Sequence, residues 1–196
     1  MRRQPVQQRS RHTVEKILAA AEQLVVDVGY DTFVASPDLL LQATGVGRGS
    51  LYAYFSSPQA VLDEIALRVL HASHAQVAAI TAAPPATWEG AVDLVIECFD
   101  ADYRRAVIRE IWLNRPLAPH ILHEDMATNS GIAAQLFTLL TRFPTKFARL
   151  ERSHCAVAVE ILDRLLRYAY RETPAGDPAL RAEARTALMA YLSVYA

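Results

Sequence analysis

The side chains best placed to bind a charged partner are concentrated in one short stretch, Gly45 to Phe55. It carries an arginine, a serine and two tyrosines, namely Arg48, Ser50, Tyr52 and Tyr54. The guanidinium group of Arg48 is a cationic fork that can grip guanine in the DNA major groove or a phosphate oxygen. Sequence-specific DNA binding is therefore the first hypothesis that the residues support.

The elements around this stretch predict a helix-turn-helix. A short apolar helix is expected from Ser36 to Ala43, with Ser36 as its cap, and a long helix opens at Ser57-Pro58 and runs to about Ala82. In such a motif the second helix lies in the major groove, and its first residues meet base edges. Leu51 and Phe55 are assigned to the core, because the inner face of the recognition helix must anchor it.

The rest of the chain also has the pattern of helices. Hydrophobic residues make up 52% of the chain, which excludes general disorder, and leucine and alanine recur at helical spacing. The first helix is expected to run from about Thr13 to Gly29, a residue suited to the left-handed C-cap conformation. Further helices are expected at 87–103, 104–114, 117–141, 149–172 and 177–195. The sequence therefore predicts an all-α protein.

Charge and breaks in the pattern divide the chain into three segments. Residues 1–12 form a basic flexible arm, since they hold four arginines and no acid although the whole chain has a net charge of −1. Such an arm suits phosphate contact. Residues 13–56 form the helix-turn-helix domain, and residues 57–196 form a C-terminal domain for effector binding and dimerisation.

Other classes of protein find little support in the sequence. There is no G-x-S-x-G, phosphate-binding glycine loop or H-E-x-x-H motif, so an enzyme is not expected. Two histidine groups, His71 with His74 and His120 with His123 and Asp125, lack a further ligand at suitable spacing, so no metal or other cofactor is expected.

The same reasoning bears on the cellular compartment. Cys98 and Cys155 lie in apolar helical patterns, as reduced core residues of a cytosolic protein do. The sequence shows no N-terminal apolar leader and no run of eighteen apolar residues, so a cytoplasmic protein without a membrane span is expected.

The first 70 residues resemble the N-terminal domain of the TetR family of bacterial transcriptional regulators. The matching segments are Ile17 to Ala21, Gly29-Tyr30, Gly45-Val46, Gly49 to Phe55 and Leu62. Weaker similarity extends to Ile111-Trp112-Leu113 and Tyr191-Leu192. The resemblance implies a homodimer that binds a palindromic operator in double-stranded DNA and acts as a repressor, which a small-molecule effector releases from the DNA.

The resemblance also implies roles for individual residues. Arg48, Gly49 and Ser50 would face base edges or phosphates at the start of the recognition helix. Tyr52 would donate a hydrogen bond to one phosphate, and Ser36 would hold another.

Three positions depart from the family pattern. Gly47 stands where Ser or Thr often caps the recognition helix, Tyr54 where His is frequent, and Pro58 where Lys commonly touches phosphate. Gly47 and Pro58 leave an alternative open, which is a helical ligand-binding or interaction protein whose degenerate helix-turn-helix no longer binds DNA specifically.

A dimer interface is expected from the last two helices. The apolar face of residues 155–171 covers more than half of the helix circumference, whereas a helix packed on one core needs about a third. The closing helix has the same character, so two helices from each chain predict a four-helix interface. A central helix in a monomer is the alternative. The predicted interface residues are Ala158, Ile161, Leu162, Leu165, Leu166, Leu188, Tyr191 and Leu192.

An effector pocket is expected where polar and aromatic residues interrupt the apolar pattern of the C-terminal domain. Ligand pockets between helices are typically apolar, with a few polar groups that fix the orientation of the ligand. Polar groups satisfied within the fold, or exposed, are the alternative. The predicted pocket residues are Phe99, Tyr103, Trp112, His120, Asp125, Asn129 and Phe137.

Overall fold

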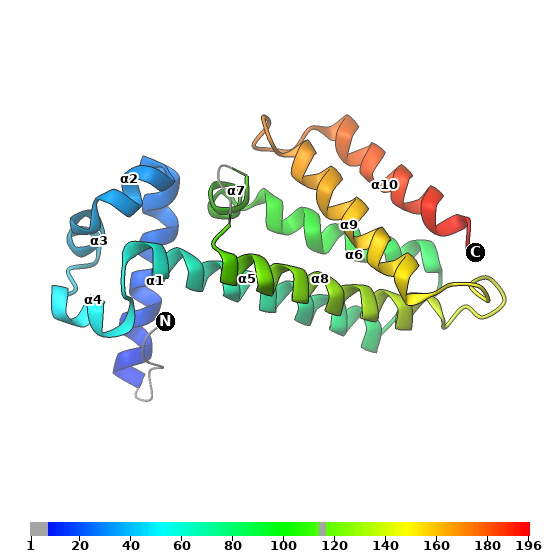
Figure 1. Ribbon diagram of the computed structural model, residues 1–196, viewed down its shortest axis with the longest axis horizontal. Helices are drawn as coiled ribbons and strands as arrows, with labels where there is room; N and C mark the ends of the chain where they lie inside the picture. Colours follow the sequence, from blue (N-terminus) through cyan, green and yellow to red (C-terminus); the bar gives the residue numbers. More distant parts are fainter. Residues whose placement is uncertain (1–7, 114–116) are drawn as a thin grey trace. The chain divides into compact units, whose positions relative to one another are not determined.

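The computed structural model describes residues 8–113 and 117–196, and every regular element in these two ranges is an α-helix (Figure 1). The all-α prediction is confirmed. The chain divides into two compact units. Unit 1 comprises Met1–Arg68 and Ala106–Ile121, and unit 2 comprises Val69–Arg105 and Leu122–Ala196.

Unit 1 holds the helix-turn-helix. Its helices are α1 (Gln8–Val28), α2 (Tyr30–Ala35), α3 (Pro37–Thr44), α4 (Arg48–Tyr54), the first part of α5 (Pro58–Ala82) and α7 (Ala106–Trp112). Helix α1 contacts α2, α3 and α7. Most of its apolar stripe is buried, together with apolar side chains from each neighbour, four of them from α7. The fully buried residues include Val14, Ile17, Ala21, Val25, Phe33, Leu40, Phe55 and Val61.

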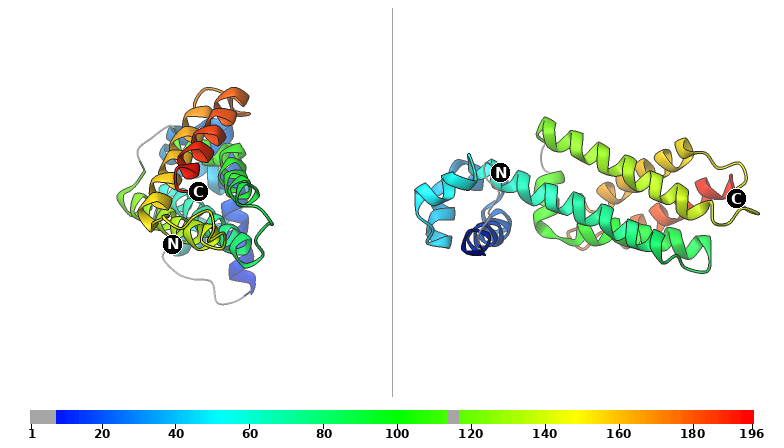
Figure 2. Two further views of the ribbon diagram at one scale, coloured as in Figure 1. Left: turned by 90° about the vertical axis from the view of Figure 1, so that its right-hand side faces the viewer. Right: turned by 90° about the horizontal axis from the view of Figure 1, so that it is seen from below.

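Unit 2 is a helical bundle in which α9 (Arg152–Ala169) and α10 (Pro178–Ser193) lie side by side (Figure 2). Both also contact α6 (Trp88–Arg104). Helix α8 (Pro119–Leu140) lies in this unit from Leu122 onward, with the second part of α5. The core of unit 2 is mostly apolar, although the Asp100 and Asp125 side chains are also buried in this unit. It includes Val92, Val95, Leu136, Leu139, Leu140, Cys155, Leu162, Leu166 and Leu188.

Local signals account for most of the helix boundaries. The backbone N–H of Gly90 donates to the Thr87 hydroxyl at 3.1 Å, and that of Ala60 donates to the Ser57 hydroxyl at 3.2 Å. Gly29 ends α1 with a φ of 79°, which glycine adopts at little cost. The predicted ends of the long helix at Pro58 and Ala82 are confirmed.

Three features differ from the sequence-based expectations. Helix α1 begins at Gln8, so residues 8–12 are helical rather than part of a flexible arm; residues 1–7 of that arm lie outside the described residues. Helix α2 occupies a stretch for which no helix was expected. Unit 1 also takes in α7 and the start of α5, because α7 packs on α1. In the described ranges, no helix is both long and apolar enough to cross a membrane.

Candidate nucleic-acid interface

The turn between α3 and α4 is fixed by its backbone. Gly45 has a φ of 62°, in the left-handed region that favours glycine, and its N–H donates to the Leu41 carbonyl at 2.8 Å. The buried Thr44 hydroxyl donates to the Leu40 carbonyl at 2.6 Å and accepts from the Val46 N–H at 3.2 Å. These bonds set where α4 begins, which confirms the predicted helix-turn-helix.

Helix α4 is anchored by one face and exposed along the other. Leu51 is 2% exposed and Phe55 is fully buried, as expected from the sequence. Every residue of the first turn is exposed, and the two tyrosines are half-buried. The predicted DNA-contacting residues of α4 and its cap therefore lie on one accessible surface: Gly47, Arg48, Gly49, Ser50, Tyr52 and Tyr54.

The N-termini of both helices lack side-chain caps. Gly47 caps α4 through its carbonyl alone, which accepts from the Leu51 N–H at 3.0 Å. A β-carbon at Gly47 would meet no atom within 4 Å, so space does not explain the glycine. Ser36 is the N-cap residue of α3, as predicted, but its hydroxyl makes no cap bond; its carbonyl accepts from the Leu39 N–H at 3.1 Å and its backbone N–H closes α2. Its phosphate contact stays a prediction.

An ion pair not expected from the sequence joins the two helices of the motif. An Nη2 of Arg48 donates to Oδ1 of Asp38 at 2.6 Å, and the two side chains are 65% and 64% exposed. Asp38 lies in the first turn of α3 and Arg48 is the first residue of α4. The pair places the guanidinium group predicted to read DNA beside the Asp38 carboxylate.

Polar side chains outside the motif form a second group in unit 1. The Nε2 of His120 lies 3.2 Å from Oδ2 of Asp63, whose Oδ1 accepts from the Gln59 amide at 2.8 Å. His120 was predicted to line the effector pocket, and it is exposed here. Pro58 is buried, so it offers DNA no side chain.

The other predicted pocket residues are divided between the units. Trp112 is buried in unit 1, whereas Phe99, Tyr103 and Asp125 are buried in unit 2, and Asn129 and Phe137 are half-buried there. Phe137 lies under the guanidinium group of Arg152, 5.0 Å from ring centroid to Cζ. The pocket formed by the whole set stays a prediction.

Tyr103 is the centre of a polar cluster in unit 2. Its hydroxyl donates to Asp163 at 2.7 Å and accepts from the Nε of Arg167 at 3.2 Å. Arg167 also lies 3.0 Å from Asp163 and 3.7 Å from Asp125. Burial, and then the Asp163 charge, raises the pKa of Tyr103 well above its ordinary value. Sequence analysis did not identify Asp163 and Arg167, which lie four residues apart on α9.

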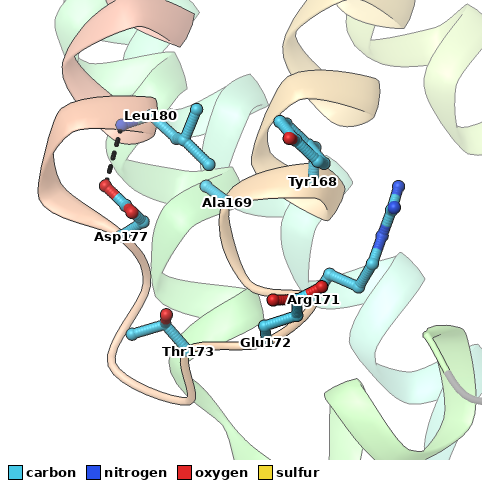
Figure 3. A pocket seen from close by; sticks show the side chains of 7 residues that line it. All are labelled: Tyr168, Ala169, Arg171, Glu172, Thr173, Asp177 and Leu180. Carbon is cyan, nitrogen blue, oxygen red and sulfur yellow. Dashed lines mark hydrogen bonds between the residues drawn. The ribbon is translucent and has the colours of Figure 1, made fainter.

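The surface cavities of unit 2 include two that lie apart from these residues. One, of about 350 Å³, is lined by His71, His74, Ala127 and Thr128. The other, of about 210 Å³, lies where α9 passes into α10, and Figure 3 shows its seven lining residues. The Asp177 carboxylate there accepts from the Leu180 N–H and so caps α10. Neither cavity contains a predicted pocket residue.

The metal-ligating and thiol side chains of the described residues were the other candidates for reactive chemistry. In the described part of the chain, no three His, Cys, Asp or Glu side chains gather closely enough to hold a metal ion. Cys98 and Cys155 are free thiols, and burial raises the pKa of Cys155 to about 12. A thiol with a raised pKa is a poor nucleophile at neutral pH.

The predicted dimer residues fall into two groups. Five of the eight are buried in the core of their own chain, where α9 and α10 pack on each other and on α6: Ala158, Leu162, Leu166, Leu188 and Leu192. These five are core residues, which corrects their placement at an interface. Ile161, Leu165 and Tyr191 are half-buried, and their contact with a partner stays a prediction.

Comparison with known proteins identifies the family. The all-α fold with a helix-turn-helix is the fold of DNA-binding regulators. The family model of the tetracyclin repressor-like C-terminal domain matches residues 87–192, more than half of the chain. The chain belongs to this family, the TetR family of transcriptional regulators. A comparison with curated proteins found no match.

Solved structures share the fold over nearly the whole chain. A TetR-family transcriptional regulator from Streptomyces coelicolor is 28% identical with a TM-score of 0.68, covering 94% of this chain and 99% of that one. PfmR from Thermus thermophilus is 22% identical with a TM-score of 0.62, over 90% and 94%. Salmonella enterica GusR is 21% identical with a TM-score of 0.64, over 92% and 95%. The last two show a shared fold.

Proposed function

We propose that the protein is a homodimeric transcriptional repressor that binds a palindromic operator through α3 and α4 and is released from it by a small-molecule effector. One observation carries this proposal: the first turn of α4 is exposed and polar, while its opposite face is anchored by Leu51 and Phe55. A helix held in this way can enter the major groove with its N-terminal residues leading.

Recognition of a palindrome needs two copies of the motif. On α9, Val157, Ile161, Leu165 and Tyr168 follow one another at four, four and three residues, and none is buried within the chain. Val157 is 47% and Tyr168 48% exposed. Apolar residues at this spacing form one stripe on a helix. The stripe supports dimerisation through α9.

The dimer is tested by a charge placed on this stripe. Leu165→Glu should yield a folded monomer, because Leu165 is half-buried and a partner would bury its charge. The matched control is Leu94→Glu, at an exposed leucine of α6, which should stay dimeric. Leu162→Glu should disrupt the fold itself, because Leu162 is 1% exposed. Light scattering that finds a wild-type monomer at micromolar concentration contradicts the proposal.

DNA contact is tested by removing one functional group at a time. Arg48→Ala should cost about 1–3 kcal/mol of operator binding if the guanidinium group reads a base. Tyr52→Phe, which removes only a hydroxyl, should weaken binding by one phosphate contact. Thermal stability should hardly change for Arg48→Ala, because that side chain is 65% exposed. Wild-type affinity in both variants would remove these residues from the interface.

A second function has its own support. The missing side-chain cap at Gly47 and the buried Pro58 favour a helical ligand-binding or interaction protein with a degenerate helix-turn-helix. A gel shift with the promoter DNA next to the protein's own gene separates the two functions. A shifted band that competitor DNA of unrelated sequence fails to remove supports the repressor, and its absence supports the alternative.

A further inference from the structure

The helix-turn-helix is almost free of charge. Between Asp31 and Asp63 the chain has two charged residues, Asp38 and Arg48, and these two form the exposed ion pair of the motif. Apart from the basic N-terminal arm, this stretch therefore offers the phosphate-rich DNA one cation, Arg48, which already has Asp38 as its counter-ion. DNA-binding surfaces are usually strongly positive. Here the ion pair affects whether Arg48 contacts a base edge or a phosphate.

The geometry of the pair leaves most of the guanidinium group available. The hydrogen bond of the pair joins Nη2 of Arg48 to Oδ1 of Asp38. A guanidinium group has five N–H donors, so donors on Nε and Nη1 remain for a second acceptor. The guanine edge offers N7 and O6, which are neutral acceptors. Arg48 can bind that edge while Asp38 stays beside it.

A phosphate is a different partner for the same group. It carries a full negative charge, and contact with Arg48 would bring that charge close to the Asp38 carboxylate. Like charges repel at this range even in water. Arg48 would have to leave Asp38, exchanging one anion for another, so the net gain from phosphate contact is small.

We propose that Asp38 is a specificity-determining residue that biases Arg48 toward a base edge and away from the DNA backbone. The inference rests on the proposed function, because it concerns the same DNA-reading surface. Asp38 lowers nonspecific affinity more than operator affinity. Asp38 contributes little to the stability of the fold, since its ion pair with Arg48 is exposed.

The test is Asp38→Asn, which removes the charge and keeps an oxygen that can accept from Arg48. Dissociation constants are measured for an operator selected by the wild-type protein and for a scrambled duplex of equal length, over a range of salt concentrations. The variant should bind the scrambled duplex about tenfold tighter, with the salt slope steeper by about one, because Arg48 now contacts phosphate. Operator affinity should rise much less, so the specificity ratio falls.

The matched control removes one acidic charge elsewhere in unit 1. Asp27 is exposed on α1, outside the motif, and accepts from the Gln23 amide at 2.9 Å. Asp27→Asn changes the net charge equally and should leave the specificity ratio as in the wild type. An equal fall of the specificity ratio in both variants would show that net charge alone causes the effect, and it would overturn the inference. An unchanged specificity ratio in Asp38→Asn would also overturn it.

The outcomes separate the inference from the function on which it rests. If the wild-type protein enriches no sequence from random duplex DNA, the proposed function fails and the inference falls with it. If the wild type enriches an operator and Asp38→Asn discriminates equally well, only the inference fails.

Discussion

Gly49, the second residue of the recognition helix, has no structural reason to be glycine. It is exposed, its φ lies outside the left-handed region, and a β-carbon built on it would meet no atom within 4 Å. Alanine is the better helix former at such a site. On the proposed function, we expect the glycine to allow DNA to approach α4 closely.

The substitution Gly49→Ala should change stability and DNA binding in opposite directions. Alanine in place of an exposed helical glycine stabilises the fold by about 0.5–1 kcal/mol, through helix propensity and reduced freedom of the unfolded chain. Against the groove, one methyl group holds α4 away from the base edges. The loss of about one base contact costs about 1–3 kcal/mol, or roughly 5- to 150-fold in affinity.

Two assays measure these effects separately. Urea unfolding is followed by Trp112 fluorescence in a Trp88→Phe background, because Trp112 is buried in unit 1 and Trp88 in unit 2. Operator binding is followed by fluorescence anisotropy of labelled DNA. Ala19→Gly, the reverse change at an exposed site on α1, is the control. It should lower stability by a similar amount and leave DNA affinity unchanged.

One result would refute the reasoning about Gly49. A Gly49→Ala protein that is more stable and binds the operator with wild-type affinity would show that DNA does not approach this part of α4. A destabilised variant would instead refute the structural premise, that neither backbone conformation nor packing requires glycine there.

Three further predictions follow from the structure. Gly47→Ser should restore a helix cap, raise stability by roughly a few tenths of a kcal/mol in urea unfolding and tighten operator binding. Burial raises the pKa of Asp102, so the contribution of Asp102 to stability is fully present below its pKa in the unfolded state and is lost as pH rises through its folded-state pKa. The Asp102→Asn side chain cannot ionise, and it keeps an oxygen that accepts from the Ser73 hydroxyl. Urea unfolding from pH 3 to 7 should therefore show no loss of stability from this position in the variant. A small, largely apolar effector bound near Trp112 should raise the melting temperature and weaken operator binding by about 1–3 kcal/mol, with DNA weakening effector binding equally. Effector binding is measured by Trp112 fluorescence in a Trp88→Phe protein. Tight effector binding with unchanged DNA affinity would exclude this site as the switch.

Most of the fold was predictable because its signals are local. Prolines at Pro37, Pro58 and Pro178 mark helix starts, and glycines at Gly29 and Gly45 mark left-handed ends. Proline fixes its own φ, and glycine adopts a positive φ at little cost, so both signals can be read without knowing the tertiary neighbours. Helix α2 was missed because six residues are too few to show a helical period.

The side-chain contacts between helices could not be predicted from the sequence. Asp38 and Arg48 are ten residues apart, and their pairing depends on the angle that Gly45 imposes on the turn. Asp163 and Arg167 have the spacing of a solvated strip, but Tyr103 of α6 and Asp125 of α8 pack against them.

The apolar width of α9 shows the same limit. The pattern indicated burial on more than one side, and it could not separate contacts within the chain from contacts with a second copy. Leu162 and Leu166 belong to the chain's own core, while Ile161 and Leu165 remain accessible. The periodicity of apolar residues indicates that a helix face is buried. Only the tertiary structure shows which element buries it.

The central claim is that α4 reads a palindromic sequence through its exposed first turn. Selection of bound sequences from random duplex DNA tests it most directly, with wild-type protein and Arg48→Ala run in parallel at physiological salt. The account predicts that the wild type enriches two inverted half-sites whose centres lie about one helical turn, or a multiple of it, apart. Arg48→Ala should lose preference at one base pair in each half-site. Enrichment of no sequence by the wild-type protein, or the same preference in both proteins, would contradict it.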